Sequence, residues 1–463
     1  MRTHPNHSTC RNVMACVVDH DLCSGCGVCA GVCPTNALSM AEALNGDLTA
    51  SWVSEPCGLN CGLCLAACPF GERVLDPRNI NKEIFGPGDG RQVLPLFHED
   101  AGYYLSAFVG YSIINRPLSA SGGLLTWTLE RLLTEGKVDR VAVVTGISDK
   151  LRGYNFVFRE VQTVEDIRQA AGSVYHQVDV TEIVRRIMGE DKIRWAVTGV
   201  PCLCVGLRQA MQRIPALRRS ICYLLGVACG MYQNTCYTEL LLAESGIDSR
   251  QATRIEYRHK AEGRPVSNYG FRVIGERGTE REITYQGLPF YLGKNAFFRL
   301  NACNYCKDVF AEAADACFMD AWLPEYHGEC DGTSIALIRN RDIQYMLEQG
   351  KAAKVLHLDQ VGIEQVVASQ NFHVRRKRYL INMRQGISTR GSSIGACIND
   401  WFAWRVQRYA QRRSKKAWMT FGRGRNVKVF WLAVWDVSLL ITLQTLYSRI
   451  VHRIRRIFIR HNR

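Results

Sequence analysis

Two runs of cysteine near the start of the chain have the spacing of ligands for iron–sulfur clusters. The first run is Cys23-x2-Cys26-x2-Cys29-x3-Cys33 before Pro34, and the second is Cys57-x3-Cys61-x2-Cys64-x3-Cys68 before Pro69. In such a run three thiolates hold one cubane and the fourth thiolate crosses to the neighbouring cluster. The sequence therefore predicts two [4Fe-4S] clusters, one held by Cys23, Cys26, Cys29 and Cys68, and the other by Cys57, Cys61, Cys64 and Cys33.

Zinc is the alternative metal, because paired cysteines also form zinc sites. Zinc sites usually present two separated pairs rather than four cysteines in one run followed by proline. Iron is therefore the preferred interpretation, although the second run has one extra residue between Cys57 and Cys61. Cys10 and Cys16 lie outside the pattern, and we expect them to be plain thiols.

Composition and cysteine content bound the class of protein. The chain has 463 residues, of which 20 are cysteine and 47% are hydrophobic, which is enough for two or three globular domains. We expect neither a secretory signal nor an N-terminal anchor, since no apolar stretch precedes Val17. The expected location is the cytoplasm, where thiols stay reduced and clustered cysteines indicate metal binding rather than disulfides.

After a linker at residues 73–94, residues 95–370 alternate between helix-like and strand-like patterns. An apolar run with helical spacing follows Gly123 and stops at Gly136, and residues 138–145 are typical of a buried strand. The same alternation recurs with a strand at 193–198, a helix at 203–213 and a strand at 221–227. This predicts an α/β (α+β) domain with much of its sheet parallel. Residues 254–291 are richer in β-formers and predict a hairpin or small subdomain.

Two further features of this domain could hold cofactors. The loop Ser119-Ala-Ser-Gly-Gly123 precedes the expected helix, so its N–H groups would suit the pyrophosphate of a dinucleotide, and an ordinary turn is the alternative. Four cysteines in turn-like contexts would hold a third [4Fe-4S] cluster if the fold joins them, and buried structural thiols are the alternative. These four are Cys202, Cys229, Cys303 and Cys306. We leave as core or surface thiols Cys204, Cys222, Cys236, Cys317, Cys330 and Cys397.

Taken together, these elements resemble the family of the coenzyme F420-reducing hydrogenase beta subunit. The resemblance covers about residues 20 to 345, and its motifs stand in the family's order. They are Ser121–Gly136 with Val138–Val144, Gly172-Ser-Val-Tyr175, Thr198-Gly-Val-Pro-Cys202, Ala228-Cys-Gly230, Tyr257-Arg-His-Lys260, Cys303-Asn-Tyr-Cys306-Lys-Asp308 with Ala314-Asp315, and Asp320-Ala-Trp322. One departure is Met319, which stands where the family usually has glycine, so a tight turn there is in doubt.

The resemblance implies an iron–sulfur flavoprotein that binds FAD and passes electrons between ferredoxin-type clusters and a substrate. Substrate classes in the family include the deazaflavin coenzyme F420 and, in other branches, chlorophyll-type tetrapyrroles. Carried over, the resemblance places Ser121, Gly122 and Gly123 against FAD, and it assigns the third cluster to Cys202, Cys229, Cys303 and Cys306. It places Lys260 near the flavin, where a cation would stabilise the reduced anionic form, and a solvated lysine is the alternative.

Residues 371–463 are predicted to form a basic, amphipathic helical tail. Of the whole chain's net charge of +15, most lies between Arg405 and Arg463, where 15 Lys and Arg face one acid, Asp436. After Ser438, helical spacing places leucines and isoleucines on one face of the expected helix and arginines on another. Such a helix suits the anionic surface at the inner face of a membrane. Asp436 interrupts the apolar run 429–447, so a spanning helix is marginal. A protein partner, a nucleic acid and a solvated tail are the alternatives, and nucleic acid is disfavoured because no recognisable binding module accompanies the charge.

The sequence thus predicts a bacterial-type 2[4Fe-4S] ferredoxin domain at residues 16–72, then the linker, the flavin-binding domain and the tail. The predicted function is that of an iron–sulfur, flavin-dependent oxidoreductase. It would exchange electrons with a redox partner protein or low-potential carrier, and coenzyme F420 or another low-potential acceptor would be its substrate. One alternative is a non-catalytic electron-transfer subunit of a larger, membrane-associated redox complex. The other alternative is a scaffold that keeps clusters for structure and binds no flavin.

Overall fold

The N-terminal part of the chain is ferredoxin-like and repeats one small unit. The computed structural model describes residues 12–54, 57, 59, 61–71, 76–88, 94–151, 153–190, 192–288, 292, 295–377, 394–422 and 427–461. After a helical turn at Met14–Val18, each cysteine run carries a short helix, α1 (Val28–Gly31) or α2 (Leu63–Ala66). A hairpin of β1 (Leu38–Glu42) and β2 (Leu48–Trp52) separates the two units.

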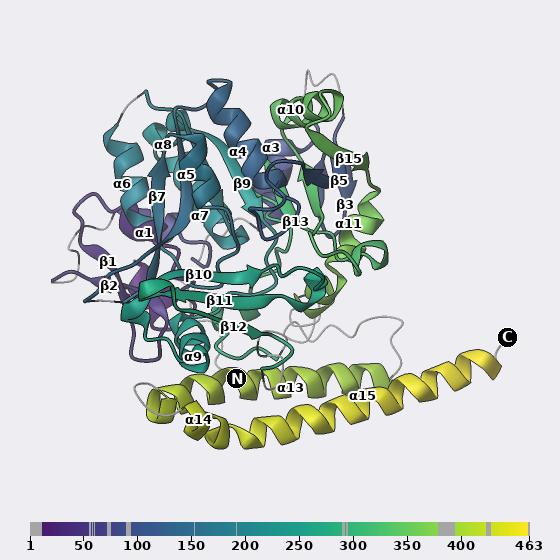
Figure 1. Cartoon of the computed structure of the whole chain (residues 1–463). Coiled ribbons are helices and arrows are strands. Elements are labelled where there is room, and N and C mark those ends of the chain that lie inside the picture. The colour runs from purple at the N-terminus through teal and green to yellow at the C-terminus, as the bar shows by residue number, and fades with distance from the viewer. Residues whose placement is uncertain are drawn as a thin grey trace.

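An eight-stranded mixed sheet forms the centre of the molecule, in the order β15-β5-β14-β13-β9-β8-β6-β7 (Figure 1). Its strands are β5 (Ser106–Ser112), β6 (Arg140–Ile147), β7 (Asn155–Val161), β8 (Trp195–Gly199), β9 (Ile221–Val227), β13 (Ala316–Asp320), β14 (Ser334–Ile338) and β15 (Leu356–Gln360). Strands β13, β9, β8 and β6 are mutually parallel. The prediction of an α/β domain with a largely parallel core is therefore confirmed, and antiparallel strands complete both edges.

Helices cover both faces of this sheet because its strands are buried on both sides. They are α4 (Leu124–Thr134), α5 (Val164–Gln169), α6 (Thr181–Gly189), α7 (Pro201–Arg213), α8 (Pro215–Ser220), α10 (Arg341–Ala352) and α11 (Ile363–Ser369). Before the sheet come α3 (Pro77–Phe85) and the short pair β3 (Leu96–His98) and β4 (Gly102–Tyr104). Single 3-10 turns lie at Ser249–Gln251, Val266–Asn268, Glu276–Gly278, Ala302–Asn304 and Pro324–Tyr326.

A second, three-stranded antiparallel sheet forms the subdomain that the sequence predicts after residue 250. It consists of β10 (Ala252–His259), β11 (Gly270–Gly275) and β12 (Glu280–Thr284), and α9 (Thr235–Ser245) packs against it. Its hydrophobic core also takes in Trp418 and Phe430 from the C-terminal helices. The tail is therefore in part a structural element of this subdomain.

The C-terminal helices are α13 (Ile394–Ala417), α14 (Val427–Ala433) and α15 (Trp435–His461), with a π-helical turn at Trp418–Gly422. Helices α13 and α15 lie side by side below the body, and α13 contacts it (Figure 1). Lys415 of α13 makes a buried ion pair of 2.7 Å with Asp47 in the ferredoxin-like hairpin, and Trp418 Nε1 donates to Glu239 of α9. Among the described residues no single helix meets the length and hydropathy needed to cross a membrane, whereas the pair Val427–Ala433 and Trp435–Val451, bent by 54°, meets them together.

Candidate functional site

The four cysteines assigned to the first cluster lie together and are buried or half-buried. Burial raises the pKa of the Cys29 thiol, and the neighbouring Cys26, Cys68 and Cys23 raise it further. Burial likewise raises the pKa of Cys68, with Cys26 and Cys23 again contributing. Cys68 of the second run thus lies near three cysteines of the first, with Cys64 also close, and the division of ligands between two clusters stays a prediction.

The second predicted group lies nearer the surface. Burial raises the pKa of Cys64, and the nearby Cys61 and Cys33 add to this, while a backbone hydrogen bond opposes it. Cys61 is exposed, and Cys33 and Cys64 are half-buried. For Cys57 the structure shows its Sγ 3.6 Å from the carbonyl of Leu59, so its membership in this group stays a prediction.

The four cysteines proposed for a third cluster also come together. Cys202 lies in the first turn of α7, and Cys229 follows β9. Cys303 lies within the 3-10 turn Ala302–Asn304, and Cys306 follows that turn. All four line one small cavity. Within the described ranges no three His, Cys, Asp or Glu side chains close on a single metal ion. A cubane sets its thiolates farther apart than one ion does, because each thiolate binds a different iron.

Three buried cations lie near these thiols. Their charges show whether a negatively charged cluster is compatible with this part of the protein. Lys377 Nζ lies 3.4 Å from Cys306 Sγ and is 2% exposed. Arg376 and Arg299 are also buried, and burial lowers the pKa of both. In the described part of the chain the Nε atoms of both arginines lack a hydrogen-bond partner. Buried cations need a compensating charge, and four thiolates around an iron–sulfur core would supply it.

A large cavity of about 940 Å³ adjoins the two buried groups of cysteines. Cys26 of the first group and Cys229 of the third both contribute to its wall. The cavity lies at the carboxyl ends of β6, β8, β9 and β13, where ligands bind in α/β sheets. Its volume is within the range of cofactor sites, about 300–1,000 Å³. The motifs that carried the family resemblance converge on it from distant positions: Gly172–Tyr175, Thr198–Val200, Ala228–Gly230, Arg258, Asp320 and Trp322.

The loop before α4 forms one wall of this cavity, and Ser119, Ser121 and Gly123 line it. Gly122 does not line the cavity, and its N–H donates to Ser334 Oγ at 2.9 Å. A Cβ on Gly122 would lie 2.6 Å from the carbonyl oxygen of Gly110, and Gly123 has φ +77°. Both glycines are thus required by close backbone packing, and the contacts of this loop with FAD stay predictions.

Lys260 lies beside the loop before α4 and not on the wall of the cavity. Its Nζ donates to the carbonyl oxygens of Arg116 (2.7 Å) and Ser121 (2.9 Å), and it is not among the residues that line the cavity. Burial, with Arg258 next, lowers its pKa to about 8. Lys260 therefore holds the loop in position, and its expected contact with a flavin stays a prediction.

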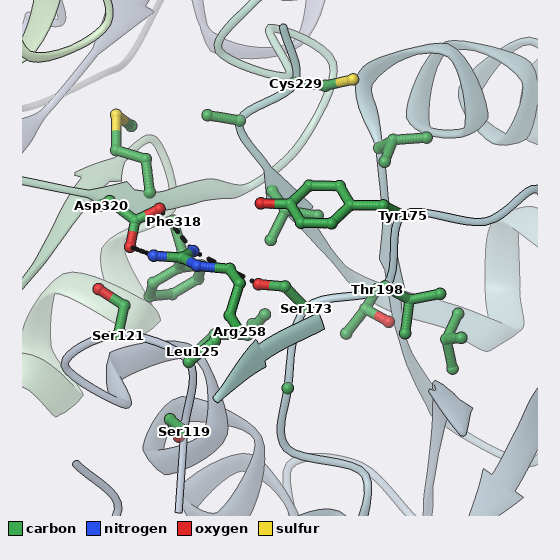
Figure 2. Close-up of a pocket in the computed structure, with 18 of the residues that line it drawn as sticks. Ser119, Ser121, Leu125, Ser173, Tyr175, Thr198, Cys229, Arg258, Phe318 and Asp320 are labelled. Atoms are coloured by element: carbon green, nitrogen blue, oxygen red, sulfur yellow. Dashed lines mark hydrogen bonds and ion pairs between the residues drawn. The ribbon is translucent and has the colours of Figure 1, made fainter. Parts of the chain in front are cut away.

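The cation that does line the cavity is Arg258, which sequence reasoning overlooked. Its guanidinium donates two hydrogen bonds to Asp320 (2.7 and 2.6 Å) and stacks on Tyr269 at 4.0 Å, beside Ser173 and Tyr175 (Figure 2). Burial lowers the pKa of Arg258, but Asp320, Tyr175 and Tyr285 together raise it more, so the net shift is upward. Arg258 and Lys260 are two positions apart, so strand alternation would place both on one face and could not have separated them; Lys260 lies just beyond the end of β10.

The segment 176–181 connects the cavity to the first cluster loop. Gln177 Nε2 donates to the carbonyl of Ser24 (3.1 Å), and the backbone N–H of Val180 donates to Cys26 (2.9 Å). His176 lines the cavity, and its Nδ1 lies 2.8 Å from Thr238 Oγ1. Burial lowers the pKa of His176 to about 4, so the ring is neutral at pH 7. No sequence motif singled out this residue.

The remaining cysteines separate as expected into buried and partly exposed thiols. Cys16, Cys204, Cys236 and Cys317 are buried, whereas Cys222 and Cys330 are half-buried. Cys10 lies outside the described residues, as does the side chain of Cys397.

The fold and the arrangement of thiols define a class of protein, an iron–sulfur oxidoreductase component with a ferredoxin-like domain joined to an α/β domain. Family models agree with this: a 4Fe-4S dicluster domain matches residues 22–72. The N-terminal and C-terminal models of the coenzyme F420 hydrogenase/dehydrogenase beta subunit match residues 107–185 and 193–363, which together exceed half of the chain. The chain belongs to the family of the coenzyme F420 hydrogenase/dehydrogenase beta subunit.

Individual relatives are distant. The chain is 25% identical over 340 residues to the coenzyme F420-dependent sulfite reductase of Methanocaldococcus jannaschii, covering 70% of this chain but only 45% of that protein. It is 22% identical over 314 residues to a subunit of the F(420)H(2) dehydrogenase of Methanosarcina mazei, covering 65% of this chain and 75% of the relative. A chain of the F420-reducing [NiFe] hydrogenase complex from Methanosarcina barkeri matches with a TM-score of 0.47 and 16% identity, covering 64% and 97% of the two chains.

Proposed function

We propose that the chain is an iron–sulfur flavoprotein that transfers electrons between a redox partner protein and a substrate of the coenzyme F420 class. The observation that carries this proposal is the large cavity, on which the family's motifs converge and to which Cys26 and Cys229 both contribute. One-electron transfer is the chemistry that the clusters supply when bound, and exchange between one-electron and hydride chemistry is what a flavin supplies. The protein must bring these groups close together and exclude water.

The described residues suit those tasks. The exposed Cys61 and half-buried Cys64 would hold a cluster where a partner protein can approach, whereas Cys26, Cys29 and Cys68 of the first group are buried. Lys377, Arg376 and Arg299 would compensate the charge of the third cluster. In the cavity, Arg258 is fixed by Asp320 and presents a permanent cation, which would favour an anionic group on a bound cofactor or substrate.

The names of the relatives support the class of substrate, since both contain coenzyme F420. The chain spans 45% of the sulfite reductase, so we do not propose sulfite as a substrate. The proposal covers both a subunit that carries out the hydride step itself and one that delivers electrons to a partner.

Iron, sulfide and flavin quantification after anaerobic purification tests the cofactor content. We expect about twelve irons, as three four-iron cubanes, and one FAD per chain. Cys303→Ala and Cys306→Ala should each lose about four irons, whereas Cys222→Ala, which removes a half-buried thiol away from the site, should lose none. About eight irons and no flavin would overturn the third cluster and the FAD assignment. Oxidation of reduced coenzyme F420 by the purified chain then distinguishes a protein that catalyses the hydride step from one that only delivers electrons.

A further inference from the structure

Helix α15 has two apolar faces, and among the residues that the structure describes only one of them is covered. Val437 is fully buried, and the ring of Tyr447 lies 6.1 Å from that of Phe402 on α13. The opposite face, the outer stripe, is between 46% and 64% exposed. It consists of Trp435, Leu439, Leu443, Leu446 and Ile450, whose spacing of three and four residues places them in one line along the helix.

The polar side chains near the outer stripe have their hydrogen bonds satisfied within the protein. Thr442 Oγ1 donates to the carbonyl of Ser438 at 3.0 Å, and Thr445 Oγ1 donates to that of Ile441 at 2.8 Å. Such internal bonds lower the cost of moving hydroxyl groups out of water. The side chains around the stripe are therefore compatible with an apolar medium.

The charge of the tail has one sign on its accessible side. Asp436 is the one acid between Arg405 and Arg463; it accepts a hydrogen bond from Tyr409 of α13, and the ion pair with Arg413 of α13 compensates its charge. Exposed Arg449 and Arg453 follow the outer stripe along α15. An apolar line bordered by cations complements a surface that is apolar inside and anionic outside.

We propose that the outer stripe docks on an anionic lipid bilayer with α15 lying parallel to the bilayer surface. Helix α15 is the outermost element on its side of the molecule, with α13 between it and the body, so a flat surface can reach it (Figure 1). Contacts with α13 hold the inner face, which favours a helix that lies on the membrane over one that spans it. A second copy of the chain, paired stripe to stripe, is the competing occupant, but an apolar partner surface leaves the exposed Arg449 and Arg453 without the anionic counterpart that a bilayer provides.

Flotation of the full-length, cofactor-loaded protein with lipid vesicles tests this proposal. We expect binding to vesicles containing 30% phosphatidylglycerol, weak binding to pure phosphatidylcholine vesicles, and release by salt. The triple change Leu439→Ala, Leu443→Ala and Leu446→Ala should lower the partition coefficient roughly 400-fold, because about three carbons per side chain, about half exposed in the free protein, leave the acyl boundary. Arg449→Gln with Arg453→Gln should lower it roughly 25-fold.

The matched control is Leu44→Ala, Leu94→Ala and Leu151→Ala, which removes three leucines that are 90%, 70% and 89% exposed on the body. It should bind vesicles as the natural chain does, and all variants should keep their iron content. The proposal is overturned if the natural chain fails to bind anionic vesicles or if both triple variants bind equally. Sedimentation equilibrium decides for a second copy instead if the natural chain dimerises and the outer-stripe variant is monomeric.

Discussion

The ion pair between Lys415 and Asp47 gives the sharpest test of how the C-terminal helices are attached. Lys415 Nζ lies 2.7 Å from both carboxylate oxygens of Asp47, and the side chains are 11% and 5% exposed. Removing one partner of a buried pair costs about 3–5 kcal/mol, because the other charge stays buried. Asp47 keeps donors from Asn45 (2.9 Å) and Asn234 (3.0 Å), so Lys415→Met should cost the lower value, about 3 kcal/mol.

Amide hydrogen exchange measures this cost as local opening of α13. At about 1.4 kcal/mol per tenfold change, opening should increase roughly 150-fold in residues 405–417 of Lys415→Met. Lys416→Met removes the same charge from the adjacent, exposed position and should change opening less than about threefold. The double variant Asp47→Asn with Lys415→Met should regain most of the protection, since neither charge is left buried. Equal exchange in the Lys415 and Lys416 variants would refute the reasoning.

Three further predictions concern the site. Lys377→Met removes the cation 3.4 Å from Cys306 Sγ and should lower the reduction potential of the proposed third cluster on the order of 60–130 mV, read by redox titration with electron paramagnetic resonance. His176 has its pKa lowered to about 4 by burial, so the unfolded state gains the proton first as pH falls. Protonation of His176 in the unfolded state should therefore lower the free energy of unfolding by about 2 kcal/mol between pH 6.5 and pH 5. His176→Gln should abolish this decrease, measured by urea unfolding. Lys260→Met leaves the carbonyls of Arg116 and Ser121 without this donor. It should lower the free energy of local opening at residues 119–123 by about 1–3 kcal/mol, which amide exchange measures as faster exchange.

Controls for these variants lie nearby in the chain. Arg375→Met removes an exposed cation two positions from Lys377 and should leave the potential unchanged. Lys137→Met removes an exposed lysine and should leave the 119–123 amides unchanged. An unchanged potential in Lys377→Met, an unchanged pH slope in His176→Gln or unchanged loop exchange in Lys260→Met would each contradict the role assigned to that residue.

Periodicity and cysteine spacing predicted the elements of the fold well, because both are local properties. The strand at 221–227 matches β9 at both ends, and the crossed grouping of Cys68 with Cys29 follows from spacing alone. The four scattered cysteines were harder to group, since only the tertiary fold brings residue 202 beside residue 306. Family resemblance, and no local pattern, supplied that set.

The roles of charged residues in the site could not be predicted from sequence. Lys260 and Arg258 belong to one basic run, and only the strand geometry shows that Arg258 lines the cavity while Lys260 contacts the loop. The basic tail likewise gave no sign that Lys415 is paired 368 positions away with Asp47. Long-range pairing of this kind leaves no periodic signal in the chain.

That pairing has a consequence for how the protein is made. The helix that joins the hairpin at Asp47 to the loop after Arg299, through Lys415 and Gln411, begins at Ile394 and so leaves the ribosome after Cys306, the last of the proposed thiol ligands. Until it docks, the loop that carries Cys303 and Cys306 lacks the contact of Gln411 with Asn304. During biosynthesis there is thus an interval in which every proposed thiol ligand has been synthesised and α13 has not yet docked. Once docked, the helix holds Asn304 through Gln411 and the hairpin at Asp47 through Lys415.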